Sequence, residues 1–348
     1  MPDVKTLVDF AVEAEIGREF RILQITDTQI IDPGQSRYPE RINNVTPLSD
    51  EQLYADCFYY IEKAIETAKP DLILMTGDNV YGEFDDSGAS LKKLIAFMEG
   101  FQIPWAPVWG NHDNECKKGV SWQCQQFEEA EYCLFKRGDV TGNSNYTIGI
   151  YRGDQLKKVI YMMDSNGCGN GKSYSYLPGY EAYNLDEKIV TQMGFGKDQL
   201  LWLDETCTRI TDDLGYAPSK FAVFHMPLWG GWETADEVGY PEGVSPEELA
   251  ITELKNVDYS PEDQHFGLIS ALCFRRLLGK HRFDGVFAGH CHLINSSILH
   301  DGILFTLGTK TGKYDSHRPN QLGGTLITLP GCDKSFRVDH IYIPDFTK

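Results

Sequence analysis

The sequence predicts an α/β fold in which strands and helices alternate along the chain. Two short runs rich in branched residues, FRILQITD from Phe20 and DLILMTGD over 71–78, are separated by a segment with apolar residues at helical spacing. Each run ends in a carboxylate. Such alternation is typical of parallel β-α-β units, whose binding sites lie at the carboxyl ends of the strands. We therefore expect the functional side chains at the strand ends.

The first half of the chain contains three such strands. Ser49 and Gln52 form an S-x-x-Q capping box, which predicts a helix that continues to about Ala68. A second helix is expected near 89–99, and a third extended run, IPWAPVWGNHD, covers 103–113. The polar residues at the ends of these strands are Asp27, Asp78, Asn111 and His112.

The second half repeats the pattern. Two strands are expected over about 144–164, then a helix near 197–213, the strand SKFAVFH ending at His225, a helix near 266–279 and the strand in FDGVFAGHCH. Short strands follow in GILFTLG, GTLITL and SFRVDHIYI. The acidic stretch 230–264 contains three prolines and little periodicity, which predicts a surface insertion. Because nothing marks a second domain, residues 1–348 are predicted to form one.

Composition limits the possible partners. The chain has 32 basic and 51 acidic residues, a net charge of −19, so its long-range field repels nucleic acid and anionic membranes. No stretch approaches the roughly 20 apolar residues of a membrane span. Nine scattered cysteines without a C-x-x-C pair indicate reduced thiols, and we expect a soluble, cytoplasmic protein. A structural zinc site at Cys116, Cys124 and Cys133 is an alternative, although their spacing matches no standard pattern.

Six separate loops offer side chains that bind metals. In extended chain His290 and His292 would point the same way, so they can approach one cation or two neighbouring ones. A mixed set of oxygen and imidazole ligands suits a pair of manganese, iron or zinc ions better than calcium. The candidates in chain order are Asp27 and Gln29, Asp78, Asn111 with His112, His225, and His290 with His292.

These motifs resemble those of the calcineurin-like metallophosphoesterase superfamily. The chain has ITDTQ, TGDNVY, WGNHDN, VFHMP and AGHCH in the family's order, over about residues 20–310. The segments NVYG and FHMPLWG and the Tyr-rich middle look most like the purple-acid-phosphatase-like and Dcr2-like branch. The resemblance implies a four-layer α-β-β-α sandwich of two mixed sheets flanked by helices.

The resemblance also implies two divalent or mixed-valence ions of manganese, iron or zinc. Asp78 would bridge them, and a metal-bridging hydroxide would attack a phosphate ester. The substrate is then a phosphorylated small molecule or another phosphoester, with monoester, diester and pyrophosphate all open. The first ion would be held by Asp27, Gln29, Asp78 and His292, and the second by Asp78, Asn111, His225 and His290.

Two further residues belong to the implied catalytic set. His112 would stabilise the phosphoryl charge or protonate the leaving group, supported by Asp113. Alternatively, Asp113 only caps a turn. Tyr81 falls where purple acid phosphatases have a tyrosinate ligand, and the alternatives are a contact that supports a ligand or a packing role.

Gln29 departs from the family pattern, because most members have His at that position. An amide oxygen in place of an imidazole nitrogen should weaken the first metal site or shift it towards harder ions such as manganese. The alternative to an enzyme is therefore a catalytically degenerate protein of the same fold that binds metal or phosphate. A third possibility is an interaction module built on 230–264.

Several other features near the motifs have two interpretations. The stretch GCGNGKS over 167–173 resembles a Walker A loop but is one residue short, which favours a flexible turn. Aromatic side chains in two loops can either stack on a base or pack the loops. These are Trp229, Trp232, Tyr176, Tyr180 and Tyr183. The candidates for contacts with distal phosphates are Lys310, His317 and Arg318.

Overall fold

The computed structural model describes residues 4–34, 49–82, 85, 87–167, 193–227, 266–331 and 334–344. The predicted insertion at 230–264, the aromatic residues at 176–183 and 229–232, and most of the 167–173 stretch lie outside these residues. Those predictions therefore stay predictions.

A five-stranded mixed sheet carries the amino-terminal motifs. Its strand order is β12-β11-β2-β3-β4, with β2, β3 and β4 parallel and β11 antiparallel to both neighbours. All five residues of β3 are buried, because this parallel strand is covered on both faces. Its sequence is therefore a continuous apolar run without polar alternation. The strands are β2 (Phe20–Ile25), β3 (Leu72–Thr76), β4 (Trp105–Val108), β11 (Gly323–Leu329) and β12 (Arg337–Tyr342).

A seven-stranded mixed sheet carries the remaining motifs. Its order is β1-β5-β6-β7-β8-β10-β9, and β6, β7, β8 and β10 run parallel to one another. The hairpin of β5 and β6 and the edge strand β9 are antiparallel. The strands are β1 (Phe10–Glu13), β5 (Tyr146–Arg152), β6 (Gln155–Met162), β7 (Ser219–Val223), β8 (Gly285–Ala288), β9 (Ser296–His300) and β10 (Ile303–Leu307).

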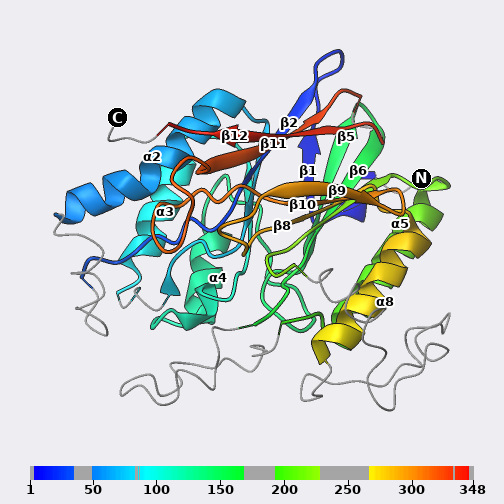
Figure 1. The fold of residues 1–348 in the computed structure, drawn as a ribbon. Coiled ribbons are helices and arrows are strands. Elements are labelled where there is room, and N and C mark those ends of the chain that lie inside the picture. The colour runs from blue at the N-terminus through cyan, green and yellow to red at the C-terminus, as the bar shows by residue number, and fades with distance from the viewer. Residues whose placement is uncertain are drawn as a thin grey trace.

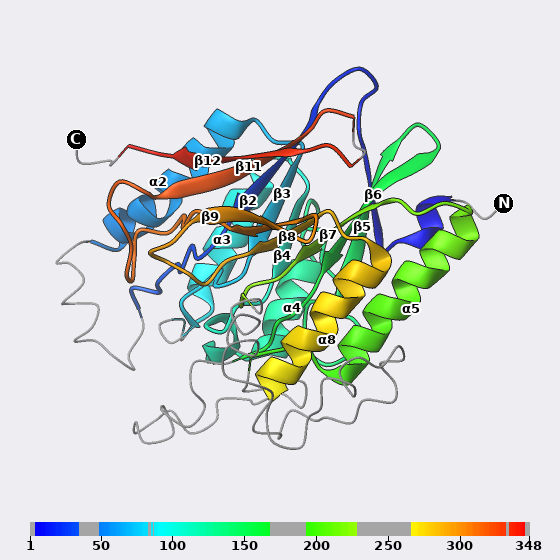
Figure 2. The ribbon, with the colours of Figure 1, turned by 45° about the vertical axis from the view of Figure 1, so that its right-hand side comes forward.

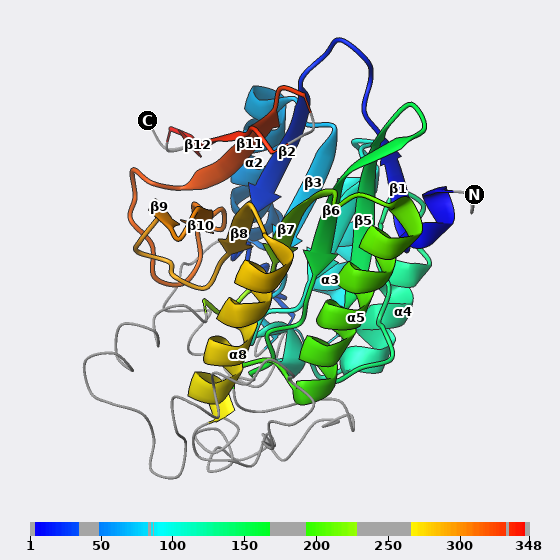
Figure 3. The same cartoon turned by 90° about the vertical axis from the view of Figure 1, so that its right-hand side faces the viewer.

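Helices cover the outer faces of both sheets. Figure 1 shows α2, α3 and α4 on the side of the five-stranded sheet, with α5 and α8 on the opposite side. The latter two lie side by side across the seven-stranded sheet (Figures 2 and 3). The helices are α2 (Asp50–Ala68), α3 (Ala89–Glu99), α4 (Val120–Glu128), α5 (Lys197–Leu214) and α8 (Phe266–His281). Short 3-10 helices occur at Val4–Leu7 (η1) and Asp113–Glu115 (η3).

The core follows the two-residue period of the strands. In β7 and the residue after it, Phe221 and Val223 point into the cluster between the sheets, whereas Ala222 and Phe224 point into the cluster beneath α5 and α8. This arrangement is the predicted four-layer α-β-β-α sandwich. Among the described residues, none of the helices is both long and apolar enough to cross a membrane.

Most predicted elements are confirmed, with differences at their ends. Ser49 caps α2 by accepting a hydrogen bond from the backbone of Gln52 (3.3 Å), but the Gln52 side chain donates to Asp56 instead of completing the capping box. The third predicted strand, β4, is shorter than the extended run predicted over 103–113. It ends at Val108, where the chain leaves the sheet. The strands β1 and β9 and the helix α4 were not among the predicted elements.

Candidate metal centre

The candidate ligands gather where β2, β3, β4, β7 and β8 end. Each follows its strand within a few residues, so adjacent parallel strands deliver their side chains to one edge of the two sheets. Carboxylate and histidine side chains there form two groups whose ligand atoms lie within 4.8 Å of one another. The first group is Asp27, Asp78 and His292, and the second is Asp78, His225 and His290. Asp78 belongs to both.

Four candidate ligands have left-handed backbones. The φ angles of Asp27, Gln29, Asp78 and His290 are 52°, 44°, 50° and 68°. The left-handed conformation raises the backbone energy of an L-residue by about 1–2 kcal/mol. The extended geometry predicted for the GHCH segment is therefore wrong. The turn at His290 directs its ring towards Asn111, whereas His292 reaches Asp27.

Glycines directly before Asp78 and Asn111 allow the candidate ligands to approach one another closely. A Cβ atom on Gly77, whose φ is 87°, would lie 2.6 Å from the ring of His225. On Gly110, a Cβ would lie 2.2 Å from Asp78. Any larger residue at either position would push two candidate ligands apart. The glycines of the GD and GNHD motifs are thus needed for packing of the site.

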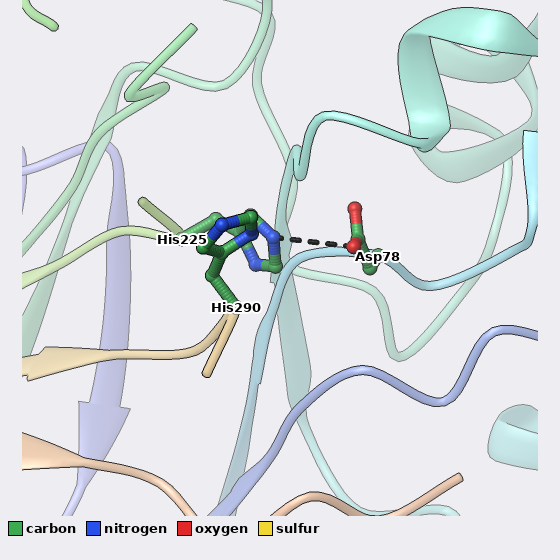
Figure 4. Close-up of side chains that lie close together, drawn as sticks. All are labelled: Asp78, His225 and His290. Atoms are coloured by element: carbon green, nitrogen blue, oxygen red, sulfur yellow. Dashed lines mark ion pairs between the residues drawn. The ribbon is translucent and has the colours of Figure 1, made fainter. Parts of the chain in front are cut away.

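The second subsite brings lone pairs together. His225 Nε2 lies 3.3 Å from Asp78 Oδ2 and 3.2 Å from Asn111 Oδ1, and His290 Nδ1 lies 3.1 Å from the same Asn111 oxygen. Figure 4 shows the two imidazoles facing the Asp78 carboxylate. Asp78 Oδ2 is buried yet accepts no hydrogen bond. An orphaned buried carboxylate oxygen beside two imidazoles is an arrangement that a cation satisfies.

The orientation of His225 supports this interpretation. Its Nδ1 lies 2.8 Å from the carbonyl oxygen of Thr76, which can only accept, so Nδ1 carries a proton. In a neutral ring the lone pair of Nε2 then faces Asp78, as in metal-binding histidines. Burial alone would lower the pKa of His225, but the charges of Asp78 and Asp27 and the contacts of the ring with Asp78 and Thr76 together outweigh it and raise the pKa to about 9. Positive charge is therefore favoured at this point, whether a proton or a metal ion supplies it.

The first subsite is built around Asp27. Its Oδ1 lies 3.1 Å from His292 Nε2, and its Oδ2 accepts hydrogen bonds from the hydroxyl of Thr26 (2.7 Å) and the backbone of His290 (3.0 Å). Burial would raise the pKa of Asp27, but the hydrogen bond from His292 and the positive charges of His225, His292 and Lys310 together outweigh it and lower the pKa to about 2. The carboxylate is therefore ionised and ready to bind a cation.

Gln29 also lies at the first subsite, in a defined orientation. Its Oε1 accepts a hydrogen bond from Lys310 Nζ (2.5 Å), and its Nε2 lies 3.4 Å from His292 Nε2. His292 is held on its other side, where Nδ1 lies 3.1 Å from the hydroxyl of Ser316. The structure thus places Gln29 beside the predicted first ion but turns its oxygen towards a lysine.

His112 reaches the site from the loop after β4. Its backbone donates to Asp78 Oδ1 (2.9 Å), and its ring Nδ1 lies 2.7 Å from Glu115 Oε2. The ring of Tyr81 lies 4.5 Å away, centroid to centroid. Burial would lower the pKa of His112, but the charges of Glu115, Asp78 and Asp315 and the hydrogen bond to Glu115 together raise it to about 10. The imidazole is therefore protonated and can donate.

Asp113 does not contact the His112 ring. Its carboxylate accepts hydrogen bonds from the backbones of Gly110 (2.8 Å), Asn79 (3.3 Å) and Val80 (3.1 Å). Burial and the charge of Asp78 raise the pKa of Asp113 to about 7. These contacts favour the turn-capping alternative over support of His112, because they join the loops after β3 and β4.

The remaining predicted residues lie at different depths. Lys310 is 3% exposed and bound to Gln29, whereas Arg318 is exposed and His317 lies near the Asp315 carbonyl (3.0 Å). The alternative zinc site is not among the described groups able to hold an ion. Its three cysteines are buried free thiols.

Glu115 and Ser316 are the partners that sequence reasoning missed. Glu115 lies three residues after His112 in a helical turn, and residues at that spacing are neighbours. The H-x-x-E spacing was therefore a usable signal. Ser316 lies 24 residues from His292 in the loop between β10 and β11, so no local pattern connects the two.

Comparison with known proteins identifies the family. The family model described as calcineurin-like phosphoesterase matches residues 20–293. The chain belongs to the calcineurin-like phosphoesterase family. This confirms the resemblance seen in the motifs.

Similar proteins include yeast and plant relatives. Phosphatase DCR2 of Saccharomyces cerevisiae is 28% identical over 188 residues, which cover 49% of this chain and 28% of DCR2. An uncharacterized protein of Schizosaccharomyces pombe is 25% identical over 67% of this chain and 41% of its own length. Probable inactive purple acid phosphatase 29 of Arabidopsis thaliana is 24% identical over 80% of this chain and 68% of its own. The chain thus spans less than half the length of the two yeast relatives.

Solved structures with a similar fold include two phosphatases. A dimetal phosphatase from Danio rerio aligns over 93% of this chain and 99% of its own, with 13% identity and a TM-score of 0.46. The purple acid phosphatase PPD1 from yellow lupin aligns over 94% of this chain and 53% of its own, with 12% identity and a TM-score of 0.46.

Proposed function

We propose that this protein is a metal-dependent phosphoesterase that binds two transition-metal ions at the centre described above. The observation that carries the proposal is Asp78, a buried carboxylate shared by two groups of ligands and left with one oxygen that accepts no hydrogen bond. The first ion would bind at Asp27, Asp78 and His292. The second would bind at Asp78, Asn111, His225 and His290.

The side chains suit a phosphate ester. When bound, two such ions supply Lewis acidity and lower the pKa of a water molecule between them. The Asn111 amide and the imidazoles are neutral ligands, so the two metal ions with their ligands would keep a net positive charge. This charge favours binding of a phosphate anion. Among the predicted substrates, phosphomonoesters and phosphodiesters both remain consistent with this set.

His112 is proposed to protonate the leaving oxygen. Its ring Nδ1 lies 2.7 Å from the Glu115 carboxylate, which favours the protonated imidazole, and its backbone hydrogen bond to Asp78 would hold it beside the ions. Glu115 binds Nδ1, which leaves Nε2 as the donor. Proton donation of this kind is worth about a hundred-fold to ten-thousand-fold in rate.

A second candidate function is binding without turnover. It is favoured by Gln29, whose oxygen is engaged by Lys310, and by relatives that are named as probable inactive purple acid phosphatases. A protein of this type would hold a metal ion or a phosphate group in the same pocket but would not hydrolyse esters.

One experiment separates the two functions. The chelated protein is reloaded with manganese, iron or zinc, and its metal content and hydrolysis of p-nitrophenyl phosphate and bis-p-nitrophenyl phosphate are measured. We expect two ions per chain and metal-dependent turnover. Asp78→Asn should remove both ions and activity, because Asp78 serves both subsites. Asp204→Asn, the same change at a carboxylate paired with Lys280, is the control. Tight metal binding without turnover of any ester would favour the binding protein.

A further inference from the structure

Lys310 is an interior lysine that the predicted metal chemistry leaves unexplained. It is 3% exposed, and its Nζ donates hydrogen bonds to Gln29 Oε1 (2.5 Å) and to the backbone oxygen of Asp27 (3.0 Å). Its own backbone is fixed in a bridge to Thr26 at the end of β2. Lys310 is therefore held at the first subsite by both its main chain and its side chain.

This contact determines which way the Gln29 amide faces. A lysine amino group at the end of its side chain donates hydrogen bonds, so the amide atom next to it must be the oxygen. Rotating the amide by half a turn would place its NH₂ group against the donors of Lys310. The NH₂ group therefore faces the ring of His292, whose Nε2 lies 3.4 Å from it.

An amide NH₂ group cannot bind a cation, because its nitrogen has no free lone pair to offer. The other ligand atoms of the first subsite form a group without Gln29, since those of Asp27, Asp78 and His292 lie within 4.8 Å of one another. Ser316 beside Nδ1 of His292 leaves Nε2 of that ring directed at Asp27. Three protein ligands leave coordination positions open for water or substrate.

We propose that Gln29 is a hydrogen-bond donor to a phosphoryl oxygen of the substrate and not a metal ligand, and that Lys310 positions it for this role. The inference rests on the proposed function and replaces the ligand role predicted for Gln29 from the sequence. Gln29 would then contact substrate, and Lys310 would act through Gln29. The first ion, with three protein ligands, binds more weakly than the second.

The test removes both partners at once. The double variant Gln29→Met with Lys310→Met replaces the hydrogen-bonded pair by apolar chains of similar length, so neither partner is left buried and unsatisfied. Mn²⁺ binding is measured by titration calorimetry and by the electron paramagnetic resonance signal of free Mn²⁺. We expect two Mn²⁺ per chain with neither affinity lowered, because the variant removes a positive charge beside Asp27 but no ligand. We also expect KM for p-nitrophenyl phosphate to rise by about tenfold or more, because a hydrogen bond to the phosphoryl oxygen is lost.

A different result would overturn the inference. If Gln29 is a ligand, the weaker Mn²⁺ site of the double variant loses about tenfold or more in affinity while the tighter site stays. Lys310→Met alone provides a second test, because it frees the Gln29 oxygen to turn towards the ion. That variant should bind the weaker Mn²⁺ more tightly than the double variant, which lacks the same charge, and equal or lower affinity would count against the positioning role.

Lys313→Met is the matched control. Lys313 lies on the same loop, but its Nζ binds Asp56 on α2 (2.9 Å) instead of the site. The control should keep both Mn²⁺ affinities and KM. Failure of the unaltered protein to bind any Mn²⁺ would overturn the proposed function itself, so the two failures are distinguishable.

Discussion

The two halves of the candidate metal centre are built differently although they share Asp78. In the second subsite, His225 is fully buried, and a backbone carbonyl holds its ring. In the first subsite, the side chain of His292 is 11% exposed and held by Ser316, which lies on an exposed loop. The second half is thus supported by the sheets, whereas the first half depends on loops. We expect the two ions to bind with unequal affinity for this reason.

The largest expected difference concerns His225 and His292. His225→Ala should remove the tighter ion and lower kcat/KM by about a thousand-fold or more, because several kcal/mol of charge stabilisation is lost. His292→Ala should remove only the weaker ion. Metal content per chain and kcat/KM for p-nitrophenyl phosphate check both. Loss of the same ion in both variants would show that the halves are not separate.

A smaller effect is expected at Glu115, next to the second half. Glu115→Gln should lower kcat for phenyl phosphate by about a hundred-fold but affect p-nitrophenyl phosphate much less. The reason is that phenolate is the poorer leaving group and needs the proton of His112 more. The measurement is the ratio of the two kcat values.

Asp113→Asn is the comparison for that variant. Its carboxylate binds backbone groups, so the change should lower the free energy of unfolding without altering the kcat ratio. The opposite result, a changed kcat ratio in Asp113→Asn and an unchanged one in Glu115→Gln, would show that Asp113 and not Glu115 supports His112.

The smallest expected effect concerns a buried carboxylate after β6, the strand that pairs with β7 of the second half. Asp164, at the end of β6, accepts hydrogen bonds from the backbones of Asn143 and Asn166 (2.7 and 2.8 Å). Burial raises the pKa of Asp164 from 3.8 to about 6. The folded state then binds a proton more tightly than the unfolded state, so stability falls as pH rises from 4 to 6.

This contribution should amount to about 2 kcal/mol. Urea unfolding at pH 4 and pH 6 measures it, with Asp164→Asn as the variant that lacks the titrating group. The decrease in stability between the two pH values should be smaller in the variant by that amount. An equal decrease in both proteins would place the titration elsewhere.

Much of the fold was predictable because local signals agreed with it. The Ser49 cap, the helical spacing after it and the apolar run of β3 each indicate one structure. The missed elements lack such signals. β1 has four residues and is a strand only because it pairs in parallel with β5. The nine residues of α4 begin at Val120, and Gly119 before them provides no side-chain cap.

The candidate site was predictable in its residues but less so in its geometry. The motifs place Asp27, Asp78 and His225 at strand ends, and the structure brings them together there. Chain adjacency favoured Asp113 as the partner of His112, but a helical turn brings Glu115 to the ring instead. The pairing of Gln29 with Lys310 joins residues 281 positions apart, so only the fold connects them.

The left-handed backbone at four of the site residues limits how this centre can be moved to another protein. Copying the side chains of Asp27, Gln29, Asp78 and His290 onto a scaffold with ordinary strand ends would point them in other directions. A designer would have to transplant the turns as well, together with the glycines that let them approach. β-Branched replacements at these positions would strain the backbone before any effect on metal appeared. The centre is therefore portable only as a set of loops.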